Sequence, residues 1–125
     1  MSSSVAKYLV RSGVAEDSRY SFLLTGADGA NLTVTQGAGQ GVTFVRTGEG
    51  VYEARFAVNP GTFKGAKFTL WASTPGDLKG YTVVRDDWDA TNLKLPFTVF
   101  NGSVTAADLI VAQGIDVELV FGISV

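Results

Sequence analysis

The sequence predicts an all-β protein, an antiparallel β-sandwich or jelly roll of about eight strands. The first observation is a period of two: apolar and polar side chains alternate through most of the chain, as in strands that bury one face. The second is turn chemistry between these runs, such as Asn59-Pro60-Gly61 and Thr74-Pro75-Gly76. The third is the scarcity of helical pattern, since one short segment alone, 105–110, favours a helical turn.

Each strand is expected where the alternation runs between two turn signals. The candidate strands are 6–10, 19–24, 31–36, 42–47, 51–58, 67–73, 81–85, 94–100 and 115–125. Asn101-Gly102, directly after one of them, predicts a hairpin turn of two residues.

The clearest local structure is the hairpin 42–58, in which two alternating runs flank a tight turn. Gly48 and Gly50 are expected to provide positive φ in that turn. In the second arm Tyr52 lies on the apolar face, whereas Glu53 and Arg55 alternate with it and are expected to face solvent.

The last strand has the most regular pattern. Its apolar face consists of Ile115, Val117, Leu119, Phe121, Ile123 and Val125, of which the first five are the candidate oligomer interface. A long apolar face of this kind suits a strand deep in a core or at an oligomer interface, and both interpretations stay open.

Composition narrows the classes of function. The 125 residues correspond to one domain, 13–125, preceded by a segment 1–12 that is either an N-terminal arm or a first strand. Histidine and cysteine are absent, which removes the usual general base, the commonest metal ligand and all thiol chemistry. The net charge of −2 and the pI of 4.9 speak against nucleic acid and anionic membranes as partners. With neither a signal peptide nor a membrane span, we expect synthesis in a cytoplasm.

The balance of charged and apolar residues is unusual for a small domain. Charged residues make up 18% and apolar residues 46% of the chain, whereas charged residues usually make up about a quarter. The excess fits a well-filled core, or a surface that is buried against another subunit. We favour the second interpretation and expect a homo-oligomer.

Two segments are candidate functional sites, and each also has a purely structural interpretation. The glycine-rich stretch 37–41 lies between strands and lacks a following Lys-Ser or Lys-Thr pair, so we interpret it as a hairpin loop and not as a phosphate site. The densest polar cluster is Arg85, Asp86, Asp87, Trp88 and Asp89. It is either an exposed loop, an interaction loop, or a calcium site, although its spacing differs from an EF-hand. Trp88 alternatively folds back onto the core.

Catalysis is not expected. A serine nucleophile would need a positioned base, and no spacing among the carboxylates selects a glycosidase pair. No cofactor is implied either. Arg46, Arg55 and Arg85 are expected to form no more than weak surface pairs with acids across strands.

Two segments carry a resemblance. The phrase Arg46-Thr47-Gly48-x-Gly50-x-Tyr52 between alternating strands resembles a recurrent phrase of small β-sandwich proteins from tailed-phage virions, and 115–121 resembles their final strand. These proteins are similar in pattern to the jelly rolls of complement and tumour necrosis factor. The resemblance implies a compact homotrimer and a structural role without catalytic residues.

On this basis we expect a capsid decoration protein on the outer surface of a phage head, with the major capsid protein as its partner. The residues expected to form its capsid-contact arm are Ser2, Ser3, Ser4, Val5, Lys7 and Tyr8. Two alternatives stay open. One is a receptor- or glycan-binding head of a tail fibre or spike that uses Trp88. The other is a carbohydrate-binding accessory domain that uses Trp71, Tyr81 or Trp88 as an aromatic platform.

Overall fold

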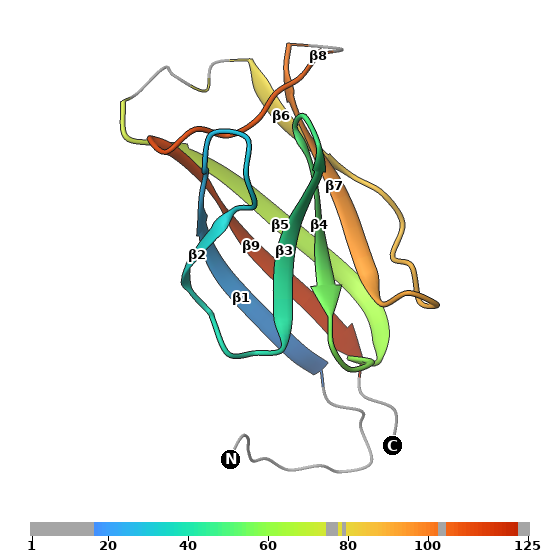
Figure 1. The fold of residues 1–125 in the computed structure, drawn as a ribbon. Coiled ribbons are helices and arrows are strands. Elements are labelled where there is room, and N and C mark those ends of the chain that lie inside the picture. The colour runs from blue at the N-terminus through green and yellow to red at the C-terminus, as the bar shows by residue number, and fades with distance from the viewer. Residues whose placement is uncertain (1–16, 75–77, 79, 103–104, 123–125) are drawn as a thin grey trace.

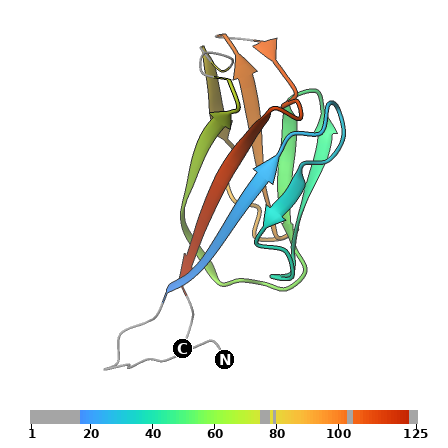
Figure 2. The same cartoon turned by 90° about the vertical axis from the view of Figure 1, so that its left-hand side faces the viewer.

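The protein folds into two antiparallel sheets packed face to face, which confirms the predicted β-sandwich (Figures 1 and 2). The computed structural model describes residues 17–74, 78, 80–102 and 105–122. Its strands are β1 Asp17–Thr25, β2 Thr33–Gln36, β3 Val42–Gly48, β4 Val51–Phe56, β5 Thr62–Ala72, β6 Tyr81–Arg85, β7 Lys94–Asn101, β8 Thr105–Ala106 and β9 Gln113–Gly122. None of the described residues belongs to a helix that could cross a membrane.

The chain passes back and forth between the sheets. The first sheet has the order β2-β1-β9-β5 and the second has the order β3-β4-β7-β6, with β8 paired to β7. The first and last described strands are therefore neighbours, and Asp17 pairs with Gly122. Consequently the chain enters β1 and leaves β9 at the same end of the sandwich (Figure 1).

The core lies between the sheets and is rich in aromatic side chains. Its largest fully buried side chains come from both sheets and from the connector between β8 and β9, which provides Leu109: Phe22, Leu24, Tyr52, Leu95, Phe97, Val99, Leu109, Ile115, Leu119 and Phe121. At one end Phe121 contacts Phe56 edge to face, with ring centroids 5.1 Å apart. Such aromatic pairs stabilise the core beyond the burial of their area.

The apolar face of the last strand belongs to this core. Ile115, Val117, Leu119 and Phe121 are at most 2% exposed because the second sheet covers them. The expected oligomer interface is therefore wrong for these four residues, which have no area left for another subunit. Ile123, the fifth member, lies outside the described residues.

Most predicted strands are confirmed, and the differences have local causes. β5 begins at Thr62, five residues before the prediction, because a bulge between Phe63 and Gly65 interrupts the alternation. The glycine-rich segment 37–41 connects β2 to β3 and so crosses between sheets, which corrects its assignment to a hairpin. The candidate strand 6–10 lies outside the described residues.

Three details of the hairpins differ from prediction. Gly50 has a φ of 71°, as expected, but Gly48 does not take a positive φ and instead belongs to β3. After β7 the pair Asn101–Thr105 leaves three residues between its partners, where two were predicted. The helical turn at 105–110 is wrong, since Thr105 and Ala106 form β8 and the next four residues are not helical.

Candidate functional site

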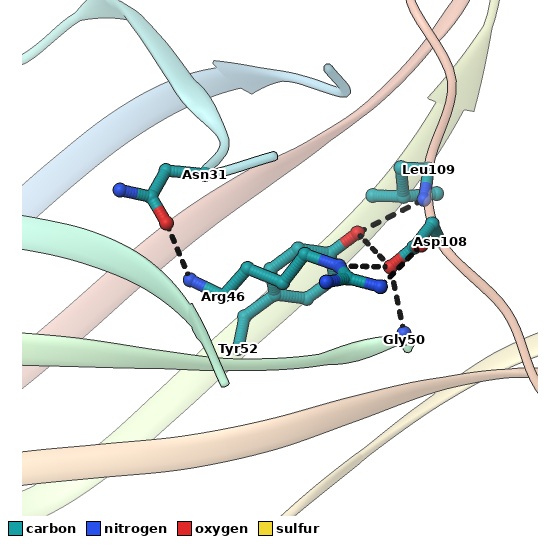
Figure 3. Close-up of polar contacts among 6 residues, drawn as sticks. All are labelled: Asn31, Arg46, Gly50, Tyr52, Asp108 and Leu109. Atoms are coloured by element: carbon teal, nitrogen blue, oxygen red, sulfur yellow. Dashed lines mark hydrogen bonds and ion pairs between the residues drawn. The ribbon is translucent and has the colours of Figure 1, made fainter. Parts of the chain in front are cut away.

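A polar cluster joins the β3–β4 hairpin to the connector between β8 and β9 (Figure 3). We call it the Asp108 cluster; its members are Arg46, Gly50, Tyr52 and Asp108. Arg46 donates from Nε to Oδ1 and from Nη2 to Oδ2 of Asp108, both at 2.9 Å. The two bonds form the parallel fork that makes arginine–carboxylate pairs strong and directional.

The same carboxylate accepts further donors from the hairpin. The backbone N–H of Gly50 donates to Oδ1 at 2.8 Å, and the hydroxyl of Tyr52 lies 3.4 Å from the same atom. The hydroxyl of Tyr52 also accepts the backbone N–H of Leu109 at 3.0 Å. Tyr52, which is fully buried, thereby has partners for its polar tip.

Glycine is required in the turn of this hairpin. Besides its positive φ, Gly50 lies so close to the connector that an added Cβ would sit 2.4 Å from the backbone N of Ala107. The connector is also held from the other side, where an added Cβ on Gly26 would sit 2.4 Å from the carbonyl oxygen of Ile110. The close approach of backbones thus positions Asp108 over the hairpin.

Electrostatics favour the charged forms of both partners. The hydrogen bonds from Arg46 lower the pKa of Asp108 below its ordinary value, and those to Asp108 raise the pKa of Arg46. Burial raises the pKa of Tyr52. The side chains of Arg46 and Asp108 are 28% and 18% exposed, so water screens part of their attraction. A carboxylate held ionised and occupied by donors of its own chain suits a structural link between segments.

The second cluster, predicted as an interaction loop, is local and partly folded onto the core. Asp89 accepts the backbone N–H groups of Thr91 and Asn92, both at 3.0 Å, and an amide N–H of the Asn92 side chain at 2.9 Å. These bonds, with that of the side chain first, lower the pKa of Asp89. Asp86 and Asp87 are exposed. Among the described residues no three acidic side chains gather as metal ligands.

Trp88 follows the interpretation in which it folds back onto the core. Its ring stacks on Phe63 with an interplanar angle of 15°, and it contacts Phe56 and Phe121 edge to face. Arg85, predicted to pair with an acid, instead places its guanidinium 4.9 Å from the ring centroid of Phe63. Phe63 therefore lies against one face of the indole.

Trp71 also packs against its own chain. Its ring atoms lie 2.3–2.4 Å from the position of an added Cβ on Gly114, so it packs against the backbone of β9. Tyr81 packs against the core. Each of the three aromatic residues proposed as a carbohydrate platform therefore packs in a different place.

Glu53 is buried, which corrects its predicted exposure to solvent. Its side chain is 7% exposed because two basic neighbours cover it. Arg55 donates to it at 2.6 Å, and the amine of Lys94 lies at 3.6 Å. Arg55 therefore pairs within its own strand, whereas Arg46 pairs with the distant connector.

Sequence reasoning missed Asp108 and Asn31. Asn31 accepts the backbone N–H of Arg46 at 2.8 Å and so ties the segment before β2 to the hairpin. A signal was present in the phrase Arg46-x3-Gly50-x-Tyr52, whose polar groups point to one shared partner. The identity of that partner required the fold, because Asp108 lies 56 residues beyond Tyr52.

The remaining hollows are shallow. Two of them, of about 240 and 260 Å³, lie on the outer face of the first sheet, and Lys67 and Glu118 line both. The expected arm residues Ser2, Ser3, Ser4, Val5, Lys7 and Tyr8 lie outside the described residues.

Comparisons with known proteins do not assign a family to the chain. No family model matches the chain, and neither a curated protein nor a solved structure matches it.

Proposed function

We propose that the protein is a structural component of a phage virion, a homotrimeric decoration protein that binds the major capsid protein and stabilises the head. The observation that carries the proposal is the phrase Arg46-Thr47-Gly48-x-Gly50-x-Tyr52. Three of its residues converge on Asp108, so the phrase that resembles virion proteins is a fold-determining unit in this chain. The β-sandwich agrees with the resemblance.

The mechanism would be mechanical. A decoration protein holds neighbouring capsid subunits together against the pressure of packaged DNA, and its affinity comes from contacts summed over several copies. It needs a rigid body and contact surfaces more than a reactive site. The aromatic core and the Asp108 cluster would supply the rigidity.

The surface we assign to subunit contact is the outer face of the second sheet. Val84 is 55% exposed there, and its neighbours on the same face include the half-buried Phe100. On β3, β4, β6 and β7 the charged side chains of this face are Glu53, Arg55 and Lys94, which pair with one another. Such a face loses little solvation of charge when a second subunit covers it.

The outer face of the first sheet provides the contrast. It carries Asp17, Arg19, Lys64, Lys67, Asp116 and Glu118. Covering it would remove six charges from water, twice as many as on the second sheet, although Arg19 pairs with Glu118 and Lys64 with Asp17. The lower number of charges on the second sheet supports its assignment as the contact surface.

The experiment for subunit contact is the solution mass by light scattering across a dilution series. We expect a trimer for the wild type and a shift toward monomer for Val84→Lys. Leu23→Lys is the matched control, because Leu23 is 37% exposed on the other sheet and the change adds the same charge. A wild type that is monomeric at every concentration would contradict a trimer of the free protein.

The experiment for capsid attachment is cosedimentation with heads of the phage that encodes the protein. Full-length protein should sediment with the heads, and a variant that lacks residues 1–12 should remain in the supernatant. Equal occupancy for both would remove the capsid-contact arm from the proposal. Failure of the full-length protein to sediment would remove the decoration function itself.

A further inference from the structure

Two exposed apolar side chains follow one another in the connector between β8 and β9. Ile110 is 46% exposed and Val111 is 63% exposed. We call this pair the apolar apex. The other large apolar side chains that are exposed in the described part of the chain, Leu23, Val58 and Val84, are far apart in sequence. A single exposed apolar side chain is ordinary on a protein surface, whereas an adjacent pair provides a small contact surface.

The apolar apex lies at the end of the sandwich opposite to that at which the chain enters β1 and leaves β9. Its connector leads into β9 at Gln113, and the next residue, Gly114, pairs with Thr25 at the end of β1. Asp17 pairs with Gly122 at the other end of the same two strands. The nine residues of β1 separate the two ends by about 26 Å, at about 3.3 Å per residue. Figure 1 shows the connector reaching β9 far from the labels N and C.

Hydrogen bonds fix the backbone of the apolar apex. The N–H of Val111 donates to Oδ1 of Asp28 at 3.2 Å, and the N–H of Ile110 donates to Oε1 of Gln113 at 3.1 Å. The backbone N–H of Gln113 in turn donates to the carbonyl of Ile110 at 2.9 Å. Leu109, the residue before the apex, is fully buried and anchors the connector in the core.

The residues on either side of the apex are held as well. The carbonyl of Ala112 accepts the N–H of Ser73 at 2.8 Å, and the carbonyl of Leu109 accepts the N–H of Asp28 at 3.2 Å. A surface whose backbone is already fixed loses little conformational entropy when it binds. The two apolar side chains are therefore preorganised to enter a socket on another molecule.

Area and charge narrow the kind of partner. The exposed parts of the two side chains amount to on the order of 200 Å², whereas a stable contact buries about 800 Å² on each partner. One apex is therefore too small to hold two copies together, but several apexes on one assembly can bind jointly. The exposed Asp28 beside the apex and the net charge of −2 disfavour an anionic lipid surface.

We propose that the apolar apex contacts the major capsid protein and enters an apolar socket on the outer surface of the head. This inference rests on the proposed function. The copies of a cyclic trimer are equivalent, so they present three apexes to three equivalent sockets. The subunit contact assigned to the outer face of the second sheet leaves the apex accessible, because the apex lies at an end of the sandwich.

The position of the apex also agrees with a clamp. The expected capsid-contact arm joins the described chain at Asp17, which is at the other end of the sandwich. A copy that used both contacts would touch two separate points of the capsid lattice. A protein that holds neighbouring capsid subunits together requires contacts of this kind.

The experiment combines cosedimentation of the full-length protein with heads of the encoding phage and solution mass by light scattering. Val111→Asp and Ile110→Asp should each lower the occupancy of heads at least about tenfold, because the socket would have to bury an unpaired carboxylate. Val58→Asp is the matched control, since Val58 is 76% exposed in the connector between β4 and β5 and the change adds the same charge. It should bind like the wild type.

Two further measurements separate a lost contact from a damaged fold. All three variants should keep the solution mass and the unfolding temperature of the wild type, because the replaced side chains are exposed. Val111→Ser, which adds no charge, should lower occupancy less than Val111→Asp but still measurably. Its effect decides the matter if the carboxylate disturbs folding.

Each contrary outcome is distinct. Occupancy equal to that of the wild type for the variants at Ile110 and Val111 would overturn the apex contact and leave the decoration function standing. A smaller solution mass for these variants would make the apex a contact between copies and overturn the proposal. Binding of the wild type but not of Val111→Asp to phosphatidylcholine vesicles would make it a lipid contact and overturn the proposal too. A wild type that does not sediment with heads would remove the decoration function, and the capsid contact with it.

Discussion

The Asp108 cluster and the Asp89 loop, residues 85–92, both combine acids with an arginine, yet they are built on different scales. Asp108 binds partners 56 to 62 residues away, from a hairpin on another part of the chain. Asp89 binds side-chain and backbone donors within three residues. The first cluster fixes tertiary structure and the second shapes one turn. The sequence around an acidic residue does not reveal whether that residue will fix tertiary structure or shape a single turn.

The largest effect is expected at Gly50, where the hairpin meets the connector. Gly50→Ala should lower the free energy of unfolding by about 3–4 kcal/mol, because it combines a positive φ with a Cβ that meets backbone. Gly39→Ala is the control, since Gly39 also has a positive φ, 88°, but nothing within 4 Å. It should cost only about 1–2 kcal/mol. Equal losses in urea unfolding would show that the close approach to the connector is unimportant.

Asp108→Ala should come next, with a loss of about 2 kcal/mol. The change leaves the guanidinium of Arg46 and the N–H of Gly50 without their acceptor. A double-mutant cycle with Arg46→Ala should show strong coupling, because each single change already breaks the bidentate pair. Two losses that simply add would contradict the link between hairpin and connector.

Much of the fold could be predicted because its strands obey the period of two. The exceptions are places where tertiary contacts overrule local pattern. Glu53 alternates onto the outer face as predicted, but Arg55 and Lys94 cover it. The segment 105–110 has helical propensity, yet the hairpin binds Asp108 in a connector that is not helical. The last strand's apolar face suited either a core or an interface, and only the position of the second sheet distinguishes them.

The candidate site was predictable only in part for the same reason. Arg46, Gly50 and Tyr52 lie within seven residues, so their phrase was visible in the sequence. Asp108 and Asn31 belong to the site through hydrogen bonds whose formation depends on how the two sheets pack. Trp88 shows the opposite case, since a tryptophan in a polar loop has an apolar body that is expected to seek the core.

The contribution of Asp108 to stability should also depend on pH. Because the pKa of Asp108 is lowered in the native protein, its ionised form stabilises the fold fully above its unfolded pKa of about 4. This stabilisation is lost as the pH falls through the lower native pKa. The stability difference between wild type and Asp108→Asn should therefore be constant near neutral pH and shrink below about pH 4. A difference that persists unchanged into acid would mean that the charge of Asp108 contributes nothing.

The smallest effect is expected at Asp89, where the hydrogen bonds are local and exposed. Asp89→Ala should reduce the unfolding midpoint less than Asp108→Ala, because the donors it leaves at Thr91 and Asn92 can turn to water. Amide chemical shifts should change only near the loop, whereas Asp108→Ala should also shift Gly50 and Leu109. Asp87→Ala, an exposed acid in the same loop, is the control and should change neither stability nor distant shifts. Shift changes from Asp89→Ala that reach the β3–β4 hairpin would contradict the division into one tertiary and one local cluster. Trp88 would then be the connection to examine, since it follows Asp87 directly and carries the loop's contacts with Phe56 and Phe121.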